Sequence, residues 1–188
     1  MDITEQKKQA RRAGFARRKQ AYGAQGDAAG RAAAHLLDYV ESVGAPENIA
    51  AYMPIRTELD PLPAMRALVE KGHRVAVPVI VGTGLPLSFR EWRPDSVMVT
   101  GPFGAQVPQE GAFLMPDLLV VPLVAFDDRG YRMGYGGGFY DRSLELLRAK
   151  RPTLAAGYGF SAQKGAVPVE KTDQPLDAMI TENGVLRF

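Results

Sequence analysis

The stretch "DLLVVPLVAFDDRGYRMGYGGGFYDR", residues 117–142, joins an apolar segment to a glycine cluster and then to the start of a helix-forming segment. Its first part, 117–127, is a nearly continuous apolar run, which is typical of a strand buried on both faces of a sheet. Glycine fills four of the five positions from Gly134 to Gly138, and a helix is predicted over 141–151. A strand, a glycine loop and a helix in this order predict an α/β sheet with a ligand site at the strand's carboxyl end.

The same alternation continues on both sides of this stretch. Predicted strands cover residues 48–55, 73–81, 85–92, 117–127, 153–160 and parts of 177–188. Predicted helices cover 4–21, 29–43, 59–72 and 141–151, and 101–113 is predicted to be a loop. In the third helix, Asp60 is a candidate N-cap and Pro61 a candidate first helical residue. We therefore expect one domain over 1–188, with a mainly parallel sheet covered by helices on both faces.

The composition limits the classes of protein to consider. The chain has 188 residues and no cysteine, which excludes disulfides, zinc–cysteine sites and thiol chemistry. No apolar run approaches the ~18–20 residues of a membrane span, and the N-terminus lacks the apolar region of a secretory signal. We expect a soluble cytoplasmic protein with no membrane or nucleic-acid partner. The oligomeric state stays open, with a monomer favoured.

The positive charge is concentrated at the N-terminus. Residues 1–22 carry seven Lys or Arg and two acids, a charge of +5, whereas the whole chain carries only +2. Lys7, Arg11 and Arg18 share one face of the predicted helix. Such a run is often only a solvated face, but it also suits an anionic ligand.

The glycine cluster is typical of a phosphate site, because backbone N–H groups before a helix can bind an anion that side chains would block. A tight turn without a ligand is the alternative. The cluster matches neither the P-loop pattern nor the dinucleotide GxGxxG pattern. Arg132 and Arg142 flank it, and each could neutralise phosphate charge or be a solvated surface arginine.

Two carboxylates are candidate magnesium ligands. Asp141 opens the predicted helix, where it could be an N-cap or could bind Mg²⁺ beside phosphates. Asp173 lies in the acidic segment "VEKTDQPLDA" (169–178), which is either a polar turn or the source of a second ligand.

Other residues suit an organic substrate. Glu58 follows a predicted strand, which is a site position in this architecture. Phe89, Trp92, Phe139 and Tyr140 could hold a flat ring or belong to the core.

Several segments of the sequence resemble those of a known family. The segment "VVPLVAFDDRGYRMGYGGGFYDR" (120–142) closely resembles the signature of 5-formyltetrahydrofolate cyclo-ligases, also called 5,10-methenyltetrahydrofolate synthetases. Further matches, in the family's order, are Lys7-x-x-x-Arg11, "YMPIRTELD" (52–60), Phe89-x-x-Trp92, Gln163 and "TDQPLDAMITENG" (172–184).

The resemblance implies a three-layer α/β sandwich and a ligase of folate-dependent one-carbon metabolism. The family converts 5-formyltetrahydrofolate to 5,10-methenyltetrahydrofolate and releases ADP and phosphate, with ATP as co-substrate and Mg²⁺ as cofactor. The implied chemistry is phosphorylation of the formyl oxygen followed by ring closure by N10. The basic helix over 1–22 would complete the ATP site.

The resemblance also implies roles for individual residues. The ATP-binding set comprises Lys7, Arg11, Arg132, Met133, Gly134, Tyr135, Gly136, Gly137, Gly138, Phe139 and Tyr140. The folate-binding set comprises Met53, Glu58, Trp92, Tyr135, Gly136, Gly137, Gly138 and Phe139. Arg132 and Tyr140 would be catalytic, and Asp141 and Asp173 would hold Mg²⁺.

The chain departs from many members of the family at "GAQVPQE" (104–110), where they have Glu-Pro, so no site residue is assigned there. Three alternatives remain. Lys8 and Arg12 also satisfy K-x-x-x-R, which leaves the register of the basic motif open. "RMGYGGGFY" is superficially similar to an RNA-binding strand motif, although three consecutive glycines make a poor strand. A different ATP-dependent ligase or kinase would keep the glycine loop but need not keep Glu58.

Overall fold

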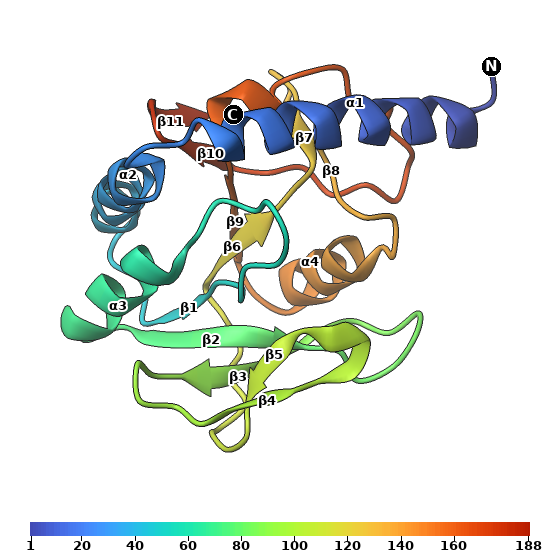
Figure 1. The fold of residues 1–188 in the computed structure, drawn as a ribbon. Coiled ribbons are helices and arrows are strands. Elements are labelled where there is room, and N and C mark those ends of the chain that lie inside the picture. Colours follow the sequence, from blue (N-terminus) through green and yellow to red (C-terminus); the bar gives the residue numbers. More distant parts are fainter.

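A computed structural model describes residues 1–188, and its centre is a seven-stranded sheet (Figure 1). The strands of this sheet are β1 (Asn48–Ala50), β2 (Arg74–Val79), β3 (Ser88–Trp92), β6 (Leu118–Pro122), β9 (Leu154–Tyr158), β10 (Ala178–Thr181) and β11 (Gly184–Arg187). The helices are α1 (Ile3–Gly23), α2 (Ala28–Ser42), α3 (Leu62–Glu70) and α4 (Phe139–Lys150). Two short 3-10 helices are η1 (Pro102–Gly104) and η2 (Ser161–Gln163).

The strand order is β11-β10-β9-β6-β1-β2-β3. The five inner strands pair in parallel, and only the edge strands β3 and β11 pair antiparallel. Parallel strands need crossovers, and α3 provides the one from β1 to β2 and α4 the one from β6 to β9. Helix α2 precedes β1 and packs on the same face of the sheet as α3. The prediction of a single-domain α/β fold with a mainly parallel sheet is confirmed.

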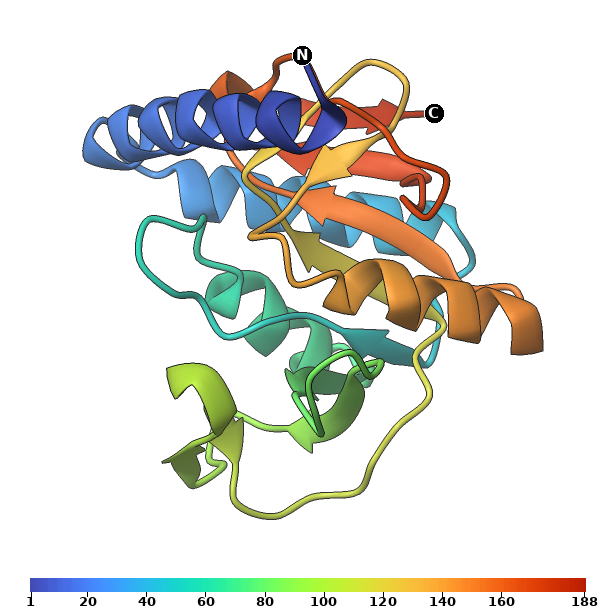
Figure 2. The same cartoon turned by 90° about the vertical axis from the view of Figure 1, so that its right-hand side faces the viewer.

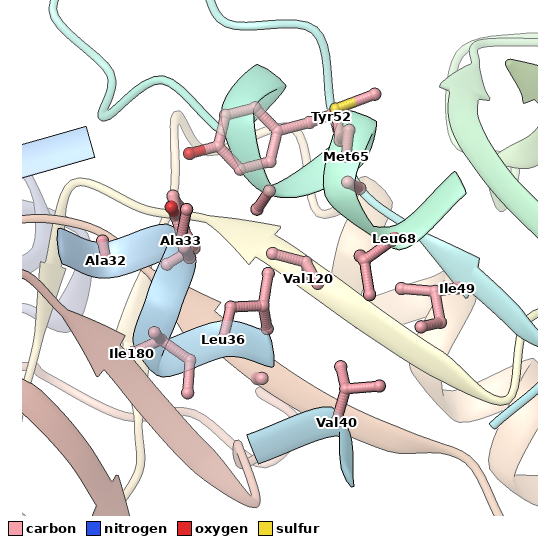
Figure 3. Packing of buried hydrophobic residues seen from close by; sticks show 14 of the residues in the cluster. Ala32, Ala33, Leu36, Val40, Ile49, Tyr52, Met65, Leu68, Val120 and Ile180 are labelled. Atoms are coloured by element: carbon pink, nitrogen blue, oxygen red, sulfur yellow. The ribbon is translucent and has the colours of Figure 1, made fainter. Parts of the chain in front are cut away.

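Two hydrophobic clusters cover the two faces of the sheet. On one face, α2 and α3 place Leu36, Val40 and Leu68 against Ile49 of β1 and Val120 of β6 (Figure 3). On the other face, Leu144 and Leu147 of α4 pack on neighbouring residues of the same strands, such as Leu119 and Val121. Successive strand residues point to opposite faces, which explains why both members of each pair are buried. Helices on both faces make the three layers visible in Figure 2.

The basic helix α1 belongs to neither layer; it lies across the carboxyl ends of the strands (Figures 1 and 2). Only Gly14 and Arg18 of its 21 residues are buried. A Cβ at Gly14 would lie 2.8 Å from the Val124 carbonyl oxygen, so glycine permits the close approach of α1 to the chain after β6. None of the helices has the length and apolar character that crossing a membrane requires.

The apolar run 117–127 is two strands rather than the single one expected. After β6 the chain leaves the sheet, and Ala125–Phe126 (β7) pairs antiparallel with Arg132–Met133 (β8). Pro122 has no N–H for the sheet, and the Val124 N–H donates to Met133 at 2.6 Å. Continuous apolarity could not reveal this break, because both halves are buried.

Other boundaries also differ from the predictions. The predicted strand 48–55 pairs only over β1, and the rest of it runs beside the candidate site. The predicted loop 101–113 contains β5 (Gln106–Pro108), paired with β4 (Met98–Thr100) in a hairpin. Helix α3 begins at Leu62, so Pro61 is its N-cap, while Asp60 accepts from the Leu62 N–H.

Candidate active site

A cavity of about 570 Å³ lies where α1, the glycine loop (Gly134–Gly138) and the carboxyl ends of β1, β2 and β6 meet. The predicted site residues that line it are Lys7, Arg11, Met53, Glu58, every residue from Arg132 to Asp141, and Asp173. These come from four separate parts of the chain. The tertiary structure therefore brings together almost the whole predicted set.

The glycine loop presents its backbone to this cavity. Gly136 has φ +102° and Gly138 has φ +68°, conformations that other residues adopt only with strain. No N–H from Gly134 to Gly138 donates a hydrogen bond to the protein backbone or a side chain. Five adjacent donors without protein partners, just before a helix of twelve residues, suit an anionic ligand.

Helix α4 begins earlier than expected. Gly138 is its N-cap and Phe139 its first residue, so Asp141 is in the first turn rather than at the cap. Asp141 Oδ1 accepts from Arg132 Nη1 at 2.9 Å and from the Gln174 N–H at 2.9 Å. Gly138 adopts the left-handed conformation and has no side chain that could cap the helix.

The cations nearest the loop have carboxylate or carbonyl partners inside the cavity. Lys7 Nζ lies 2.6 Å from Glu170 Oε2 and 2.8 Å from Asp173 Oδ2. Burial alone would lower the pKa of Lys7, but the hydrogen bonds to Asp173 and Glu170 outweigh it and the pKa is raised. Lys7 is therefore fully charged at neutral pH.

Two arginines contact the loop carbonyls. Arg11 Nε donates to the Gly134 oxygen at 3.1 Å, and Arg142 Nη2 donates to the Gly137 oxygen at 2.8 Å. Lys8 and Arg12 are exposed and do not line the cavity. Of the two possible registers of the basic motif, the Lys7–Arg11 register is the one that meets the cavity.

Glu58 lies at the opposite end of the cavity from Lys7 along α1, and its side chain is only 4% exposed. Its Oε2 accepts from the Ile55 N–H at 2.9 Å, and its Oε1 accepts from the Tyr135 hydroxyl at 3.3 Å. Burial raises the pKa of Glu58, while the Ile55 N–H and Arg18 act against that shift. Tyr52 and Met53 line the cavity beside it.

Tyr140 has a buried hydroxyl that makes no hydrogen bond with the protein. Burial raises the pKa of this hydroxyl, and the nearby negative charge of Glu58 raises it further. The hydroxyl of Tyr140 therefore stays protonated. A buried donor without a partner is uncommon, and this residue lines the cavity. Its hydroxyl is therefore suited to a polar group of a bound ligand.

The carboxylates Asp141 and Asp173 fit a magnesium ion that is held mainly by phosphate and water. Both line the cavity, and Asp141 Oδ2 accepts no hydrogen bond. The structure contains no cluster of three or more acidic or histidine side chains that could hold a metal ion by themselves. Mg²⁺ beside phosphates needs only one or two carboxylates, so the donor set is sufficient.

The prediction of Trp92 as a ligand contact is not supported. Trp92 is 4% exposed in the core beneath α2 and α3, and it does not line the cavity. Phe89 packs in the other cluster, under α4. A spacing of three along a strand places two side chains on opposite faces, so this pair cannot enclose one ring.

Sequence reasoning missed other parts of the lining. Pro78 and Ile80 of the β2 end, Leu87, and Val107 of β5 form an apolar wall. These residues look like ordinary strand residues, and no motif marks them. Arg18 was assigned only to a basic face, although it is 1% exposed and contacts the site.

The remaining polar residues of the motifs have structural partners. Gln163 Nε2 donates to the Leu123 and Val124 oxygens at 2.8 and 3.2 Å, which stabilises the break after β6. Outside the motifs, the two histidines of the chain, His35 and His73, each contact a backbone oxygen, and neither lines the cavity. The glycines lie in a loop between β8 and α4, not in a strand of the main sheet, which removes the basis of the RNA-motif alternative.

The chain is similar in sequence to proteins of one known family. The family model of the 5-formyltetrahydrofolate cyclo-ligase family matches residues 3–182. The chain belongs to this family. The predicted family and the prediction of an enzyme are thereby confirmed.

Relatives within the family cover most of the chain. The 5-formyltetrahydrofolate cyclo-ligase of Escherichia coli (strain K12) is 34% identical over 162 residues, which is 82% of this chain and 88% of that protein. The protein of the same name from Haemophilus influenzae is 34% identical over 149 residues, covering 76% and 79%.

Solved structures agree with the fold. The 5,10-methenyltetrahydrofolate synthetase of Aquifex aeolicus superimposes with a TM-score of 0.69 at 27% identity, covering 100% of this chain and 93% of that one. The 5,10-methenyltetrahydrofolate synthetase of Mycoplasma pneumoniae superimposes with a TM-score of 0.71 at 24% identity, covering 97% of this chain and 99% of that one. At this identity the likeness supports the fold alone.

Proposed function

We propose that this protein converts 5-formyltetrahydrofolate to 5,10-methenyltetrahydrofolate with ATP and Mg²⁺, releasing ADP and phosphate. The single observation that carries the proposal is the chemical asymmetry of one cavity. One end has cations and free N–H groups, and the other has a buried carboxylate and apolar walls. The glycine loop borders both ends.

At the first end, the triphosphate of ATP would bind the N–H groups of the glycine loop together with Lys7, Arg11 and Arg132. Free backbone donors and cations stabilise phosphate charge without any rearrangement of the loop. Lys7 and Arg132 now contact Asp173 and Asp141. The phosphates would take the place of those carboxylates as partners of the cations.

Asp141 and Asp173 would hold Mg²⁺, with phosphate oxygens and water as the other ligands. When bound, the ion neutralises phosphate charge and stabilises the charge that develops in phosphoryl transfer. Displacement of Lys7 and Arg132 toward the phosphates would leave Asp141 Oδ2 and Asp173 Oδ1 without a protein partner, while the Gln174 and Glu170 N–H groups still hold the other oxygens.

At the second end, Glu58 would accept hydrogen bonds from the N–H groups of the pterin ring. Its carboxylate is held from two sides by the Ile55 N–H and the Tyr135 hydroxyl. Met53 and the wall of Pro78, Ile80 and Leu87 would contact the apolar faces of the folate.

The reaction requires positioning rather than a protein nucleophile. The formyl oxygen attacks the γ-phosphorus and ADP leaves, which converts a poor leaving group into a phosphate ester. N10 then attacks the formyl carbon, the C–O bond breaks, phosphate departs and the N10 proton is lost. Arg132 would neutralise charge on the transferred group, and the Tyr140 hydroxyl would donate to it.

The direct test is the absorbance of 5,10-methenyltetrahydrofolate formed by the purified protein from 5-formyltetrahydrofolate. Product should accumulate only when ATP and Mg²⁺ are both present, and ADP should form in equal amount. Omission of Mg²⁺ or ATP provides the controls. No product under complete conditions would refute the proposal.

A further inference from the structure

Arg18 is an arginine in the most polar helix of the protein, yet it is 1% exposed. A buried cation is costly unless it is paired and hydrogen-bonded. Arg18 has such partners from three segments of the chain. Its burial therefore reflects a specific set of contacts rather than the loose packing of a surface helix.

The contacts of Arg18 converge on the folate end of the cavity. Nη2 donates to the Tyr135 hydroxyl at 2.8 Å, and Nη1 lies 3.9 Å from Glu58 Oε1. Nε donates to Thr57 Oγ1 at 3.1 Å, and Nη1 donates to the Leu123 oxygen at 3.4 Å. The guanidinium thus joins the segment after β1, the chain after β6 and the glycine loop.

Tyr135 lies between the two charges and contacts both. Its hydroxyl accepts from Arg18 and donates to Glu58 Oε1. The guanidinium also lies over the Tyr135 ring, 5.5 Å from its centroid, and over the Phe15 ring at 5.2 Å. These contacts fix both the direction of the tyrosine hydroxyl and the rotamer of the glutamate.

The same helix carries the cations at the other end of the cavity. Lys7, Arg11 and Arg18 lie on one face of α1, and eleven residues span about 16 Å of helix. A rigid helix keeps that separation constant. The distance between the cationic end and the Glu58 end is therefore set by α1.

We propose that Arg18 is a positioning residue that orients Glu58 and Tyr135 for the folate and ties substrate recognition to the helix that carries Lys7 and Arg11. This inference rests on the proposed function. Arg18 does not line the cavity, so it acts through these two side chains.

The pH dependence of folate binding distinguishes this role from a merely structural one, because it depends on the charge of Arg18. Glu58 can accept from a ligand on both oxygens only when it is ionised, and Arg18 acts against the burial that raises its pKa. The other titratable or charged groups facing Glu58 are Arg56, Tyr52, Tyr135 and Tyr140. Loss of the Arg18 charge should move the acid limb of folate binding to higher pH.

The experiment measures binding of 5-formyltetrahydrofolate, and separately of a non-hydrolysable ATP analogue, by calorimetry from about pH 5 to 9. Arg18→Met should weaken folate binding about tenfold or more at neutral pH and raise the midpoint of the acid limb. Binding of the ATP analogue should change less than about twofold. Arg17→Met is the matched control, since Arg17 is on the same helix and does not line the cavity.

A second variant keeps the inference testable if Arg18→Met does not fold. Arg18→Lys keeps the charge but cannot reproduce the contacts with both Tyr135 and Leu123. It should weaken folate binding about tenfold and leave the acid limb where the wild type has it.

Two results would overturn the positioning role. One is folate binding by Arg18→Lys that equals that of the wild type. The other is an Arg18→Met variant whose acid limb is unmoved and whose two ligands weaken by the same factor. If the wild-type protein binds no 5-formyltetrahydrofolate, the proposed function itself fails, and that outcome is distinct from both.

Discussion

The two ends of the cavity differ in how their charges are held. At the end near Lys7, the cations contact Asp141, Glu170 and Asp173, which border the same open space. At the other end, Glu58 and Arg18 are almost fully buried, and each has hydrogen-bond partners from fixed segments. The first set can exchange partners with a ligand, whereas the second is preorganised.

This difference matches the proposed roles. A nucleotide brings negative charge and a metal ion. Cations that are paired with carboxylates in the free protein therefore lose little interaction energy when phosphate replaces those partners. A folate ring brings few charges and must be oriented, which requires acceptors whose direction is already set. Substitutions at the two ends should therefore affect the two ligands separately.

Removal of Arg132 should cause the greatest loss. Its guanidinium is 5% exposed and contacts Asp141 beside the free loop donors. Arg132→Ala should lower kcat by about 10²–10³-fold, because the positive charge that would neutralise the transferring phosphate is lost. Single-turnover formation of methenyltetrahydrofolate measures the effect. Arg129→Ala, which removes an exposed arginine paired with Asp127, should retain activity.

The Arg132 variant also tests whether the first end exchanges partners. If Arg132 served only to hold Asp141, its loss would lower the melting temperature and leave kcat within about tenfold of the wild type. That result would contradict the catalytic assignment of Arg132.

Glu58→Gln should have an intermediate effect that is confined to the folate. The substitution replaces a charged hydrogen-bond acceptor for the folate by a neutral amide. Folate binding should therefore weaken by about 10–100-fold, while the affinity for ATP should stay the same. Burial raises the pKa of Glu58 above 4.5, so wild-type folate binding should fall on acidification at a pH above that value. The acid limb should be absent in Glu58→Gln.

Parallel titrations of both ligands against pH measure this prediction. Glu91→Gln is the matched control, because Glu91 pairs with Arg74 between β2 and β3 and lies outside the cavity. Equal weakening of ATP and folate by Glu58→Gln would show that the two ends are not separate.

The smallest effect should distinguish Lys7 from Lys8. Lys7→Met removes a cation that lines the cavity, and ATP binding should weaken about tenfold. Lys8→Met removes an exposed lysine paired only with Glu5, and binding should change less than about twofold. Titration with an ATP analogue measures both. The reverse pattern would favour the Lys8–Arg12 register.

Local patterns predicted the elements of the fold well where one signal was sufficient. Helical spacing located α2, and apolar runs located β6 and β9. The patterns failed where burial looks the same in different structures, as in the break between β6 and β7 at Leu123 and Val124. They also failed for the β4–β5 hairpin, whose apolar residues are few and interrupted by Gly101 and Gly104.

The candidate site was predictable in proportion to the specificity of its motifs. The glycine loop and the cations of α1 were named from the sequence, because few structures require those residues in that order. Trp92 was placed wrongly, since its motif does not state which face of β3 it occupies. Pro78, Ile80 and Leu87 were missed, because an apolar residue that lines a cavity looks like one that fills a core.

The sequence by itself determined the alternation of strands and helices, the family, and which residue types meet at the carboxyl ends of the strands. Those features depend on the local spacing of residues and on motifs that can be recognised from their order along the chain. The tertiary structure alone decided that Arg18 is buried against Glu58 and Tyr135, and that Lys7 rather than Lys8 meets the cavity. Both depend on how α1 is rotated and placed across the sheet, which contacts distant in sequence determine.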